Sequence, residues 1–423
     1  MNSVREQIVS ISSLLMGMSM LLMGNSLQGT LIAIRAVGEK FSANAIGIMA
    51  SSYFLGFVAG TLVTAYLIER AGHIRAFTAL ASLASAAALG HIIIIEPIAW
   101  TVFRAISGFC FAGIYMVIES WLNERATNET RGQVLASYMV VNLLSLTMGQ
   151  FLIAAADPLG YVLFCIVSIL VSVAIIPVSI TRTMAPAPQK PRPLPIRRLF
   201  TISPLGFVGC FAYGLAMGAF WGLAPVFAGN VGLDTNGVAF FMSLCILGGG
   251  LMQWPMGWLS DNFDRRKVLM GGSFATAGLA ALVAIGGTIK PELLVYMAFL
   301  FGAASFPIYA VTVSHANDYV QAEERVVVSG TLLLIYGAGA IVGPLLAGPV
   351  MAFAGDEGLF YYIGGVFFVV GIYAAWRMTR RAAPTAEEKT NFVPTPNATP
   401  VAAALDPHSE PMPEHSEGAE QSK

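Results

Sequence analysis

Residues 257–267 read Gly257-Trp258-Leu259-Ser260-Asp261-Asn262-Phe263-Asp264-Arg265-Arg266-Lys267 and separate two long apolar runs. A degraded copy of this stretch, Ala65 to Arg75, lies 192 positions earlier (257 − 65) between two similar runs. Two related loops between paired apolar runs predict a duplicated membrane bundle. A helical bundle of two related halves is the architecture of secondary transporters, whose substrate site forms where the halves meet.

The duplication extends well beyond this loop. It shows as matched residues at an offset of 192, and later of 194, among them Asn44 with Asn236, Gly56 with Gly248, Gly108 with Gly302, Tyr115 with Tyr309, Asn123 with Asn317 and Gly149 with Gly343. A nearly constant register with one small step indicates an internal repeat. We therefore predict two halves of six helices each.

The composition is that of a chain solvated by lipid. Hydrophobic residues make up 56% of the chain and charged residues 11%, and the mean hydropathy is +0.71. A membrane span needs about 20 mostly apolar residues, and twelve such stretches can be placed: 9–33, 43–67, 76–95, 98–121, 133–155, 159–181, 205–228, 236–259, 268–287, 292–315, 327–352 and 359–376. The sequence thus predicts an all-α membrane protein with twelve transmembrane helices, the first of them a retained helix and not a cleaved signal peptide.

The cations are distributed unevenly over the predicted loops. With the N-terminus inside, 19 of the 23 Lys and Arg residues fall in cytoplasmic segments, and short translocated loops avoid positive charge. We therefore expect both termini to lie in the cytoplasm.

The chain divides into two halves, 1–181 and 205–381, joined by the basic, Pro-rich cytoplasmic linker 182–204. The linker is expected to touch anionic lipid and not to bind nucleic acid. Residues 382–423 are rich in Pro, Ala and Glu, which predicts a disordered cytoplasmic tail. The four cysteines, Cys110, Cys165, Cys210 and Cys245, fall in apolar spans without metal-ligand spacing, so we expect no metal site and no cofactor.

The repeated loop resembles the Gly-x-Leu-Ala-Asp-Arg-x-Gly-Arg-Arg/Lys signature of the major facilitator superfamily. Residues Gly257, Leu259, Asp261, Arg265 and Arg266 fit it in the second copy, and Leu67, Arg70 and Gly72 in the first. The run Arg104 to Gly113 is similar to the family's Arg-x-x-x-Gly helix, and Ser51 to Gly56 with Glu119-Ser120 looks like the YcaD-like bacterial branch. The resemblance covers about residues 9–377. It implies the major facilitator fold and small-molecule transport across the bacterial cytoplasmic (inner) membrane.

The charges of the two loops are candidates for a latch between the halves. An acid at a helix end beside cations can bridge to the other half when the cytoplasmic side is shut, and lose those contacts when it opens. The predicted latch residues are Glu69, Arg70 and Arg75 in the first half, Asp261, Arg265 and Arg266 in the second, and Glu119 near the cytoplasmic end of the fourth span. The alternative is that these charges only fix topology, or that Glu119 only reaches the membrane interface.

Arg104 lies inside the fourth span, where an unpaired Arg costs several kcal/mol unless it faces a wet cavity or a partner. Gly108, Tyr115 and Glu119 follow on one helical stripe with it. In the family fold the first, fourth, seventh and tenth spans line the central cavity, so the resemblance implies that this stripe faces it. We predict that Arg104 attracts an anionic group of the substrate. The alternative is that it bonds backbone carbonyls near the outer end.

Other polar and aromatic residues of the cavity-type spans are weaker candidates for substrate binding. Asn25 and Gln28 are i, i+3 neighbours and can share a helix face. Tyr213, Trp221 and Tyr309 could form an aromatic wall, or mark the membrane boundary. Asn142 and Gln150 rank below these.

The sequence thus predicts a secondary active or facilitative transporter of a small organic solute that works by alternating access. Protons are a candidate coupling ion, through Glu119, His91 or His315, yet no acid lies near the middle of a span, which leaves coupling open. The sequence has no Gly-x-x-x-x-Gly-Lys-Ser/Thr loop and no nucleophile with a plausible base, so neither an ATP-driven pump nor an enzyme is expected. The alternative function is a non-transporting membrane sensor or scaffold with the carrier fold.

Overall fold

The computed structural model describes residues 2–127, 129–180, 194–380, 389–394, 399 and 401. Its first half holds α1 (Asn2–Gly38), α2 (Ala43–Ala71), α3 (His73–Ile93), α4 (Pro97–Arg125), α5 (Arg131–Phe151) with η1 (Leu152–Ala155), α6 (Val162–Val173) and α7 (Ile175–Ile180). Its second half holds α8 (Ile196–Ile202), α9 (Pro204–Asn230), α10 (Thr235–Asn262), α11 (Arg265–Ile289), α12 (Pro291–Ser305), α13 (Pro307–Asn317), η2 (Ala322–Glu324), α14 (Arg325–Ala354) and α15 (Gly358–Met378).

Twelve helical segments of the described chain are long and apolar enough to cross a membrane, which confirms the predicted number of spans. Several helices run past the predicted boundaries, however, although α3 ends at Ile93, short of the predicted residue 95. The first was predicted to end at residue 33 and continues to Gly38, and α4 continues beyond 121 to Arg125. Apolar content marks only the part of a helix inside the hydrocarbon, whereas backbone hydrogen bonds continue into the polar interface.

Several helices begin where the sequence supplies an N-cap. The Ser42 hydroxyl accepts from the Ala45 N–H at 3.2 Å, and the Asp234 carboxylate accepts from the Gly237 N–H at 2.7 Å. Pro97 begins α4, where its missing N–H costs nothing. These caps define short loops and so keep consecutive helices antiparallel.

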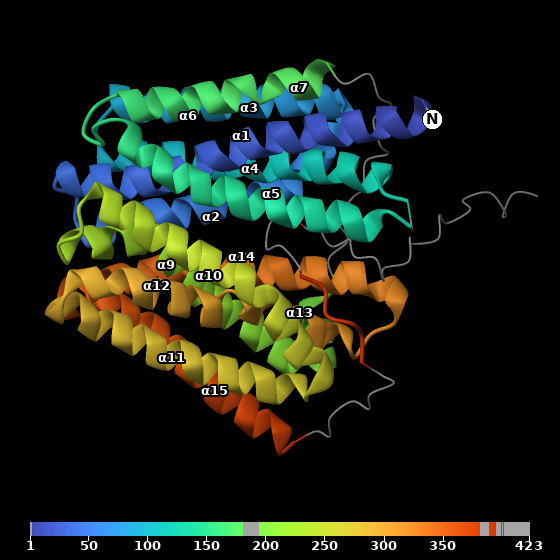
Figure 1. Cartoon of the computed structure of the whole chain (residues 1–423), viewed down its shortest axis with the longest axis vertical. Coiled ribbons are helices and arrows are strands. Elements are labelled where there is room, and N and C mark those ends of the chain that lie inside the picture. Colours follow the sequence, from blue (N-terminus) through green and yellow to red (C-terminus); the bar gives the residue numbers. More distant parts are fainter. Residues whose placement is uncertain are drawn as a thin grey trace, which may run out of the picture.

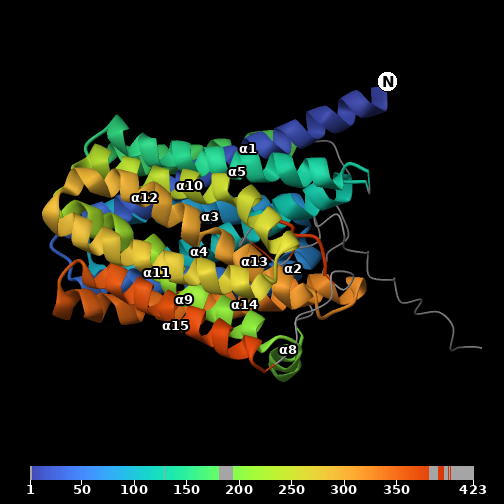
Figure 2. The ribbon, with the colours of Figure 1, turned by 60° about the horizontal axis from the view of Figure 1, so that its bottom comes forward.

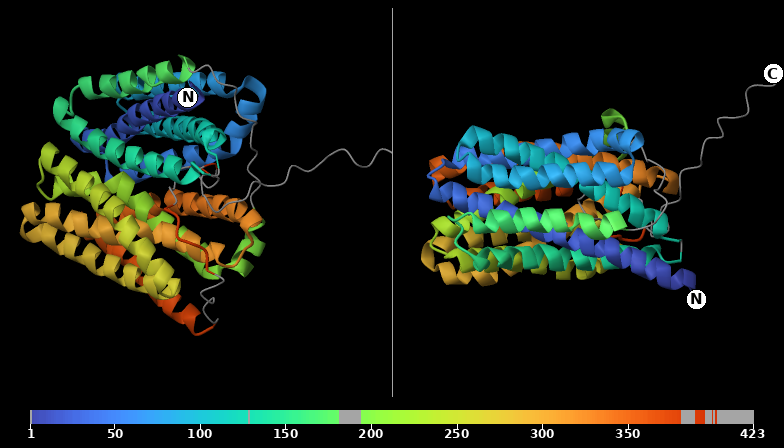
Figure 3. Two further views of the ribbon diagram at one scale, coloured as in Figure 1. Left: turned by 45° about the vertical axis from the view of Figure 1, so that its right-hand side comes forward. Right: turned by 90° about the horizontal axis from the view of Figure 1, so that it is seen from above.

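The two halves form separate layers of helices (Figure 1). The blue-to-green half carries α1 to α7 and the yellow-green-to-red half α9 to α15, and the left view of Figure 3 shows the same division from another side. Of the predicted linker 182–204, residues 182–193 lie outside the described residues, and 194–204 are described. Of the predicted tail 382–423 the structure describes 389–394, 399 and 401, and these residues pack against the bundle.

Glycines that match across the repeat mark the tightest helix crossings. A Cβ on Gly56 of α2 would lie 1.9 Å from the Ala105 carbonyl oxygen of α4, and one on Gly108 would lie 2.0 Å from the Tyr53 carbonyl oxygen. The partners in the second half, Gly248 on α10 and Gly302 on α12, would meet the Phe299 and Cys245 carbonyl oxygens at 2.1 and 2.0 Å. Only glycine allows backbones to approach this closely, so α4 is held against α2.

The bundle has two ends (Figure 2). We call the end that holds the loops after α2 and α10 the latch end, and the opposite one the far end. At the far end the halves touch directly: a Cβ on Gly47 would lie 2.6 Å from the Pro344 carbonyl oxygen, and one on Gly348 would lie 3.0 Å from that of Ala43. The halves are thus closed against each other at the far end.

Candidate substrate cavity and latch

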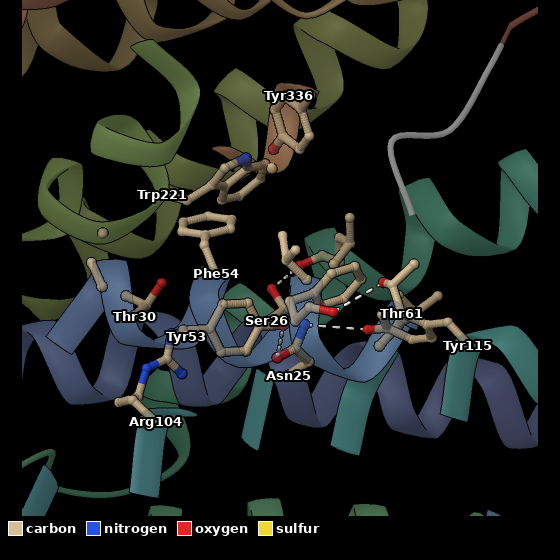
Figure 4. Close-up of a pocket in the computed structure, with 18 of the residues that line it drawn as sticks. Asn25, Ser26, Thr30, Tyr53, Phe54, Thr61, Arg104, Tyr115, Trp221 and Tyr336 are labelled. Atoms are coloured by element: carbon tan, nitrogen blue, oxygen red, sulfur yellow. Dashed lines mark hydrogen bonds between the residues drawn. The ribbon is translucent and has the colours of Figure 1, made fainter. Parts of the chain in front are cut away.

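A cavity of about 1250 Å³, counting its open mouth, lies between the two halves. Its first-half wall comes from α1, α2, α4 and α5 and carries most of the polar lining residues beside apolar ones such as Phe54 and Phe57, and its second-half wall is mostly apolar and comes from α9, α10 and α14 (Figure 4). The polar lining includes Asn25, Ser26, Thr30, Tyr53, Thr61, Arg104, Tyr115, Asn142 and Gln150, and the facing wall includes Trp221, Met242, Leu333, Leu334 and Tyr336. The cavity is therefore amphipathic, with its polarity divided between the halves.

Arg104 is the one charged side chain among the described residues that line the cavity. It is 9% exposed, and its guanidinium carbon lies 4.3 Å from the centroid of the Tyr53 ring. Within the described part of the chain its Nη1 makes no hydrogen bond. A cation–π contact compensates only part of the cost of a desolvated guanidinium.

Two short hydrogen-bond chains order the polar wall. The Tyr53 hydroxyl donates to Asn25 Oδ1 at 3.2 Å, and Asn25 Nδ2 donates to the Tyr115 hydroxyl at 3.2 Å. These bonds fix the ring on which Arg104 rests. Thr30 donates to Gln150 Oε1 at 2.7 Å, and Gln150 Nε2 donates to the Ser26 hydroxyl at 2.8 Å. Much of the capacity of these amides to bond a ligand is thus used within the first half.

The structure brings Arg104, Tyr115, Asn25 and Trp221 to this one cavity, as their predicted role requires. Gln28 lies outside the cavity lining and is 1% exposed. The lining residues of α1 are Leu22, Asn25, Ser26, Gly29 and Thr30, which form one arc of the helix with Asn25 at its edge, and Gln28 falls beyond that edge. Asn25 and Gln28 therefore do not share the cavity face.

Tyr213 and Tyr309 also lie outside the lining. Their ring centroids are 5.5 Å apart, and that of Tyr336 lies 5.8 Å from Tyr213 and 5.5 Å from Tyr309. Of this cluster Tyr336 alone belongs to the cavity lining. The two predicted tyrosines therefore form the packing behind the wall.

Tyr53 and Tyr336 were not predicted for the site, and Asn142 and Gln150 ranked low. Tyr53 stands inside Ser51–Gly56, the stretch quoted for the family resemblance, so its position offered a signal. Tyr336 lies on α14, which is the eleventh span and not one of the expected cavity-lining spans. The buried His91 lies among Trp100, Phe103 and Phe164, outside the cavity lining.

At the latch end Arg265 is the centre of a buried cluster. Its Nη2 donates to Asp261 Oδ1 at 3.0 Å, and its Nη1 donates to Asp318 Oδ1 and to the Ser314 carbonyl at 2.7 Å each. The side chains of Arg265 and Asp318 are both 1% exposed. Burial raises the pKa of Asp318 above its ordinary value, although the Arg265 guanidinium opposes this. Asp318 follows α13 and was not predicted as a latch residue.

The other predicted latch residues differ in their exposure and in the contacts described for them. Arg266 pairs with Asp264 at 2.7 Å. Arg70 and Arg75 are exposed and make no ion pair with the described residues, and Glu69 is exposed as well. Glu119 is fully buried and accepts a hydrogen bond from the Tyr138 hydroxyl at 2.8 Å. Among the described residues, these ion pairs of Asp261, Arg265 and Arg266 all lie within the second half, so the bridge between the halves stays a prediction.

Comparison with known proteins agrees with this geometry. Residues 14–250 and 206–407 match the profile of the Major Facilitator Superfamily. The uncharacterized MFS-type transporter YcaD of Salmonella newport is 30% identical over 359 residues, which cover 84% of this chain and 92% of that protein.

Two solved structures have a similar fold. One is a mutant of the nucleoside transporter NupG, with a TM-score of 0.75, 13% identity, and coverage of 88% of this chain and 99% of the other. The second is the D-xylose–proton symporter, with a TM-score of 0.67, 13% identity, and coverage of 91% and 99%. At these identities the likeness concerns the fold.

Proposed function

Because the chain belongs to the Major Facilitator Superfamily, and is therefore a multi-pass membrane transporter, we propose that it carries a small organic solute across the bacterial cytoplasmic membrane by alternating access. The observation that carries the proposal is the cavity between the halves, which are closed against each other at the far end. A rocking motion about such a cavity exposes it to one side at a time.

The proposed orientation places the latch end in the cytoplasm. Both the start of α1 and the end of α15 lie at this end (Figure 2). The cation-rich loops also belong to it, including the one between α10 and α11, and short translocated loops avoid cations. Both termini are therefore proposed to be cytoplasmic.

We propose Glu119 as the group that binds the coupling proton. It is a fully buried carboxyl on the cavity-lining helix α4, bonded to the Tyr138 hydroxyl. A carrier driven by protons needs a group of this kind that exchanges protons inside the bundle. If Glu119 has this role, a pH gradient drives solute accumulation in proteoliposomes, and Glu119→Gln retains downhill exchange but loses accumulation.

Two-sided access to the cavity tests the carrier against a sensor or scaffold. In a background whose four cysteines are replaced, Leu334→Cys places one thiol on the cavity wall. A membrane-impermeant maleimide should label it in both right-side-out and inside-out vesicles, because alternation exposes the cavity to each side. The control is Phe353→Cys, which is 94% exposed beside the far end and should react in one orientation only. Labelling of Leu334→Cys from a single side would contradict the carrier.

A further inference from the structure

The proposed transport function leaves the solute unnamed, and the inference rests on that function. Arg104 is a nearly buried cation in a cavity whose other described lining residues are neutral. We propose that the solute is a small organic monoanion, with its acid group at Arg104 and its apolar body against the second-half wall. An anion offsets the cost of the desolvated guanidinium, which a neutral ligand leaves in place.

The surroundings of Arg104 leave at least one of its buried donors without a hydrogen bond to a described residue. Tyr53 covers one face of the guanidinium at 4.3 Å, and Asn25 holds Tyr53 through its hydroxyl. Nη1 has no hydrogen-bond acceptor within the described part of the chain. A planar guanidinium supported from one side presents its N–H groups edge-on, which is the geometry that a carboxylate accepts.

The facing wall suits a flat or apolar body. Trp221 packs with Phe220 and Phe306, whose ring centroids lie 5.4 and 5.7 Å from its own, and the two phenylalanine rings also pack against each other at 5.9 Å. An aromatic fixed in this way offers contact area at little entropic cost. Since the described lining carries one cation, a dianion would keep an uncompensated charge. A polyol would compete for amides such as Gln150 that are already bonded.

Matched acid and amide pairs test this solute class. Phenylacetate, indole-3-acetate and hexanoate, each beside its neutral amide, are added to the purified full chain, and the shift in thermal unfolding midpoint is measured. At least one acid should stabilise the protein while its amide does not. Arg104→Gln should weaken binding of that acid by about tenfold or more, since about 1.4 kcal/mol corresponds to a factor of ten, and Arg104→Lys should retain part of it.

Arg35→Gln is the matched control, because Arg35 pairs with Glu39 at 2.7 Å outside the cavity lining, and it should bind as the wild type does. Equal shifts with acids and amides, no shift with any acid, or unchanged binding by a folded Arg104→Gln would each overturn the anion proposal. Two-sided labelling of Leu334→Cys reports on the carrier separately, so a carrier for a different solute class would be recognised.

An independent observation concerns the tail. The Thr390 N–H and hydroxyl donate to Asp318 Oδ1 at 2.9 and 3.1 Å, and the Phe392 N–H donates to Asp261 Oδ1 at 2.8 Å. Arg265 donates to the Thr390 hydroxyl at 3.1 Å and to its carbonyl oxygen. The tail thus bonds the groups that form the second-half latch.

The Phe392 ring packs against Gly257, the glycine of the second latch loop. A Cβ on Gly257 would lie 2.5 Å from the Phe392 Cδ1 atom. Lys389 Nζ donates to the Phe263 carbonyl at 2.6 Å, and Val393 is buried. Backbone hydrogen bonds, a ring contact and a buried apolar residue together indicate that the tail binds at a specific site on the second half.

The same tail also reaches the first half. The Thr399 hydroxyl donates to Glu119 Oε2, and Val401 packs in a small buried cluster with Ala65 and Met116. Tail residues therefore contact both halves at the latch end, through Thr390 on one side and Thr399 on the other.

We infer that the tail is a strap that holds the latch end open and slows alternation. In the latch proposed from the sequence, Asp261, Arg265 and Glu119 bond partners across the halves when this end closes, and the bound tail already bonds all three. The strap must leave before the latch can close, and its departure adds a free-energy cost to each cycle.

Tail variants of the full chain test the strap. Phe392→Ala removes the ring, and Thr390→Pro removes the N–H that bonds Asp318. Each should raise the rate at which Leu334→Cys is labelled from the far side several-fold, and a synthetic peptide of residues 387–402 should slow the Phe392→Ala protein again. The control is Asn391→Ala, since Asn391 is exposed between the two contacts. Unchanged rates in both variants, or a peptide without effect, would overturn the strap.

Discussion

Asp264 shows how one carboxylate can serve a helix end and an ion pair together. It is the N-cap of α11, and its Oδ1 accepts from the Arg266 N–H and Nε at 3.0 Å each while Oδ2 accepts from Nη2 at 2.7 Å. Burial of Asp264 pushes its pKa upward, but the bonds from Arg266 outweigh this and hold the pKa below the ordinary 3.8. The charged form is therefore favoured by the fold.

The consequence is a pH-dependent contribution to stability. Asp264→Ala removes cap and ion pair and should lower stability by about 1 kcal/mol or more, whereas Asp264→Asn retains an acceptor and should lose less. Because the folded pKa lies below 3.8, the carboxylate contributes fully above that pH and loses its contribution as the pH falls through the lowered value. Thermal unfolding midpoints of wild type and Asp264→Asn, compared from neutral pH downward, should converge below pH 3.8. A constant difference across this range would contradict the assignment.

At the scale of elements, the repeat and the spans followed from the sequence, while rotations about helix axes did not. Apolar runs long enough to cross a membrane determined the number of helices, and the matched Gly56 and Gly248 identified equivalent crossings. Gln28 and Tyr53 show the limit. If α1 or α2 rotated about its axis by the angle between neighbouring residues, a residue that faces the cavity would become buried and another would take its place. The local sequence does not determine this rotation.

The latch shows a second limit. Asp261 and Arg265 belong to a recognisable motif, so both could be named as latch residues, but the expected partners were in the other half and the two pair with each other instead. Asp318 and Phe392 reach the same place from segments 53 (318 − 265) and 127 (392 − 265) residues beyond Arg265, and neither carries a local signal. The composition of the tail predicts that it cannot fold alone, but says nothing of whether it can add a few contacts to a surface that is already formed.

At the scale of the whole molecule, alternation requires the far end to open. The halves meet there with backbone contact: a Cβ on Gly348 would lie 3.3 Å from the Asn44 Cα and 3.0 Å from the Ala43 carbonyl oxygen. Two such positions are close enough for a disulfide, whose Cα atoms are usually about 4.4–6.8 Å apart. Asn44→Cys with Gly348→Cys, in the background without native cysteines, should therefore cross-link α2 to α14 on oxidation.

The cross-link should hold the far end shut and leave the latch end free. Added to Leu334→Cys, with that thiol read out by maleimide, the oxidised pair should confine labelling to the latch side, and reduction should restore labelling from both sides. Each single cysteine, which cannot close the bridge, should behave as the parent does. If the fully oxidised protein still reacts from the far side, the cavity opens there without separation of α2 from α14, and rocking of the two halves as units is not the motion that moves the solute.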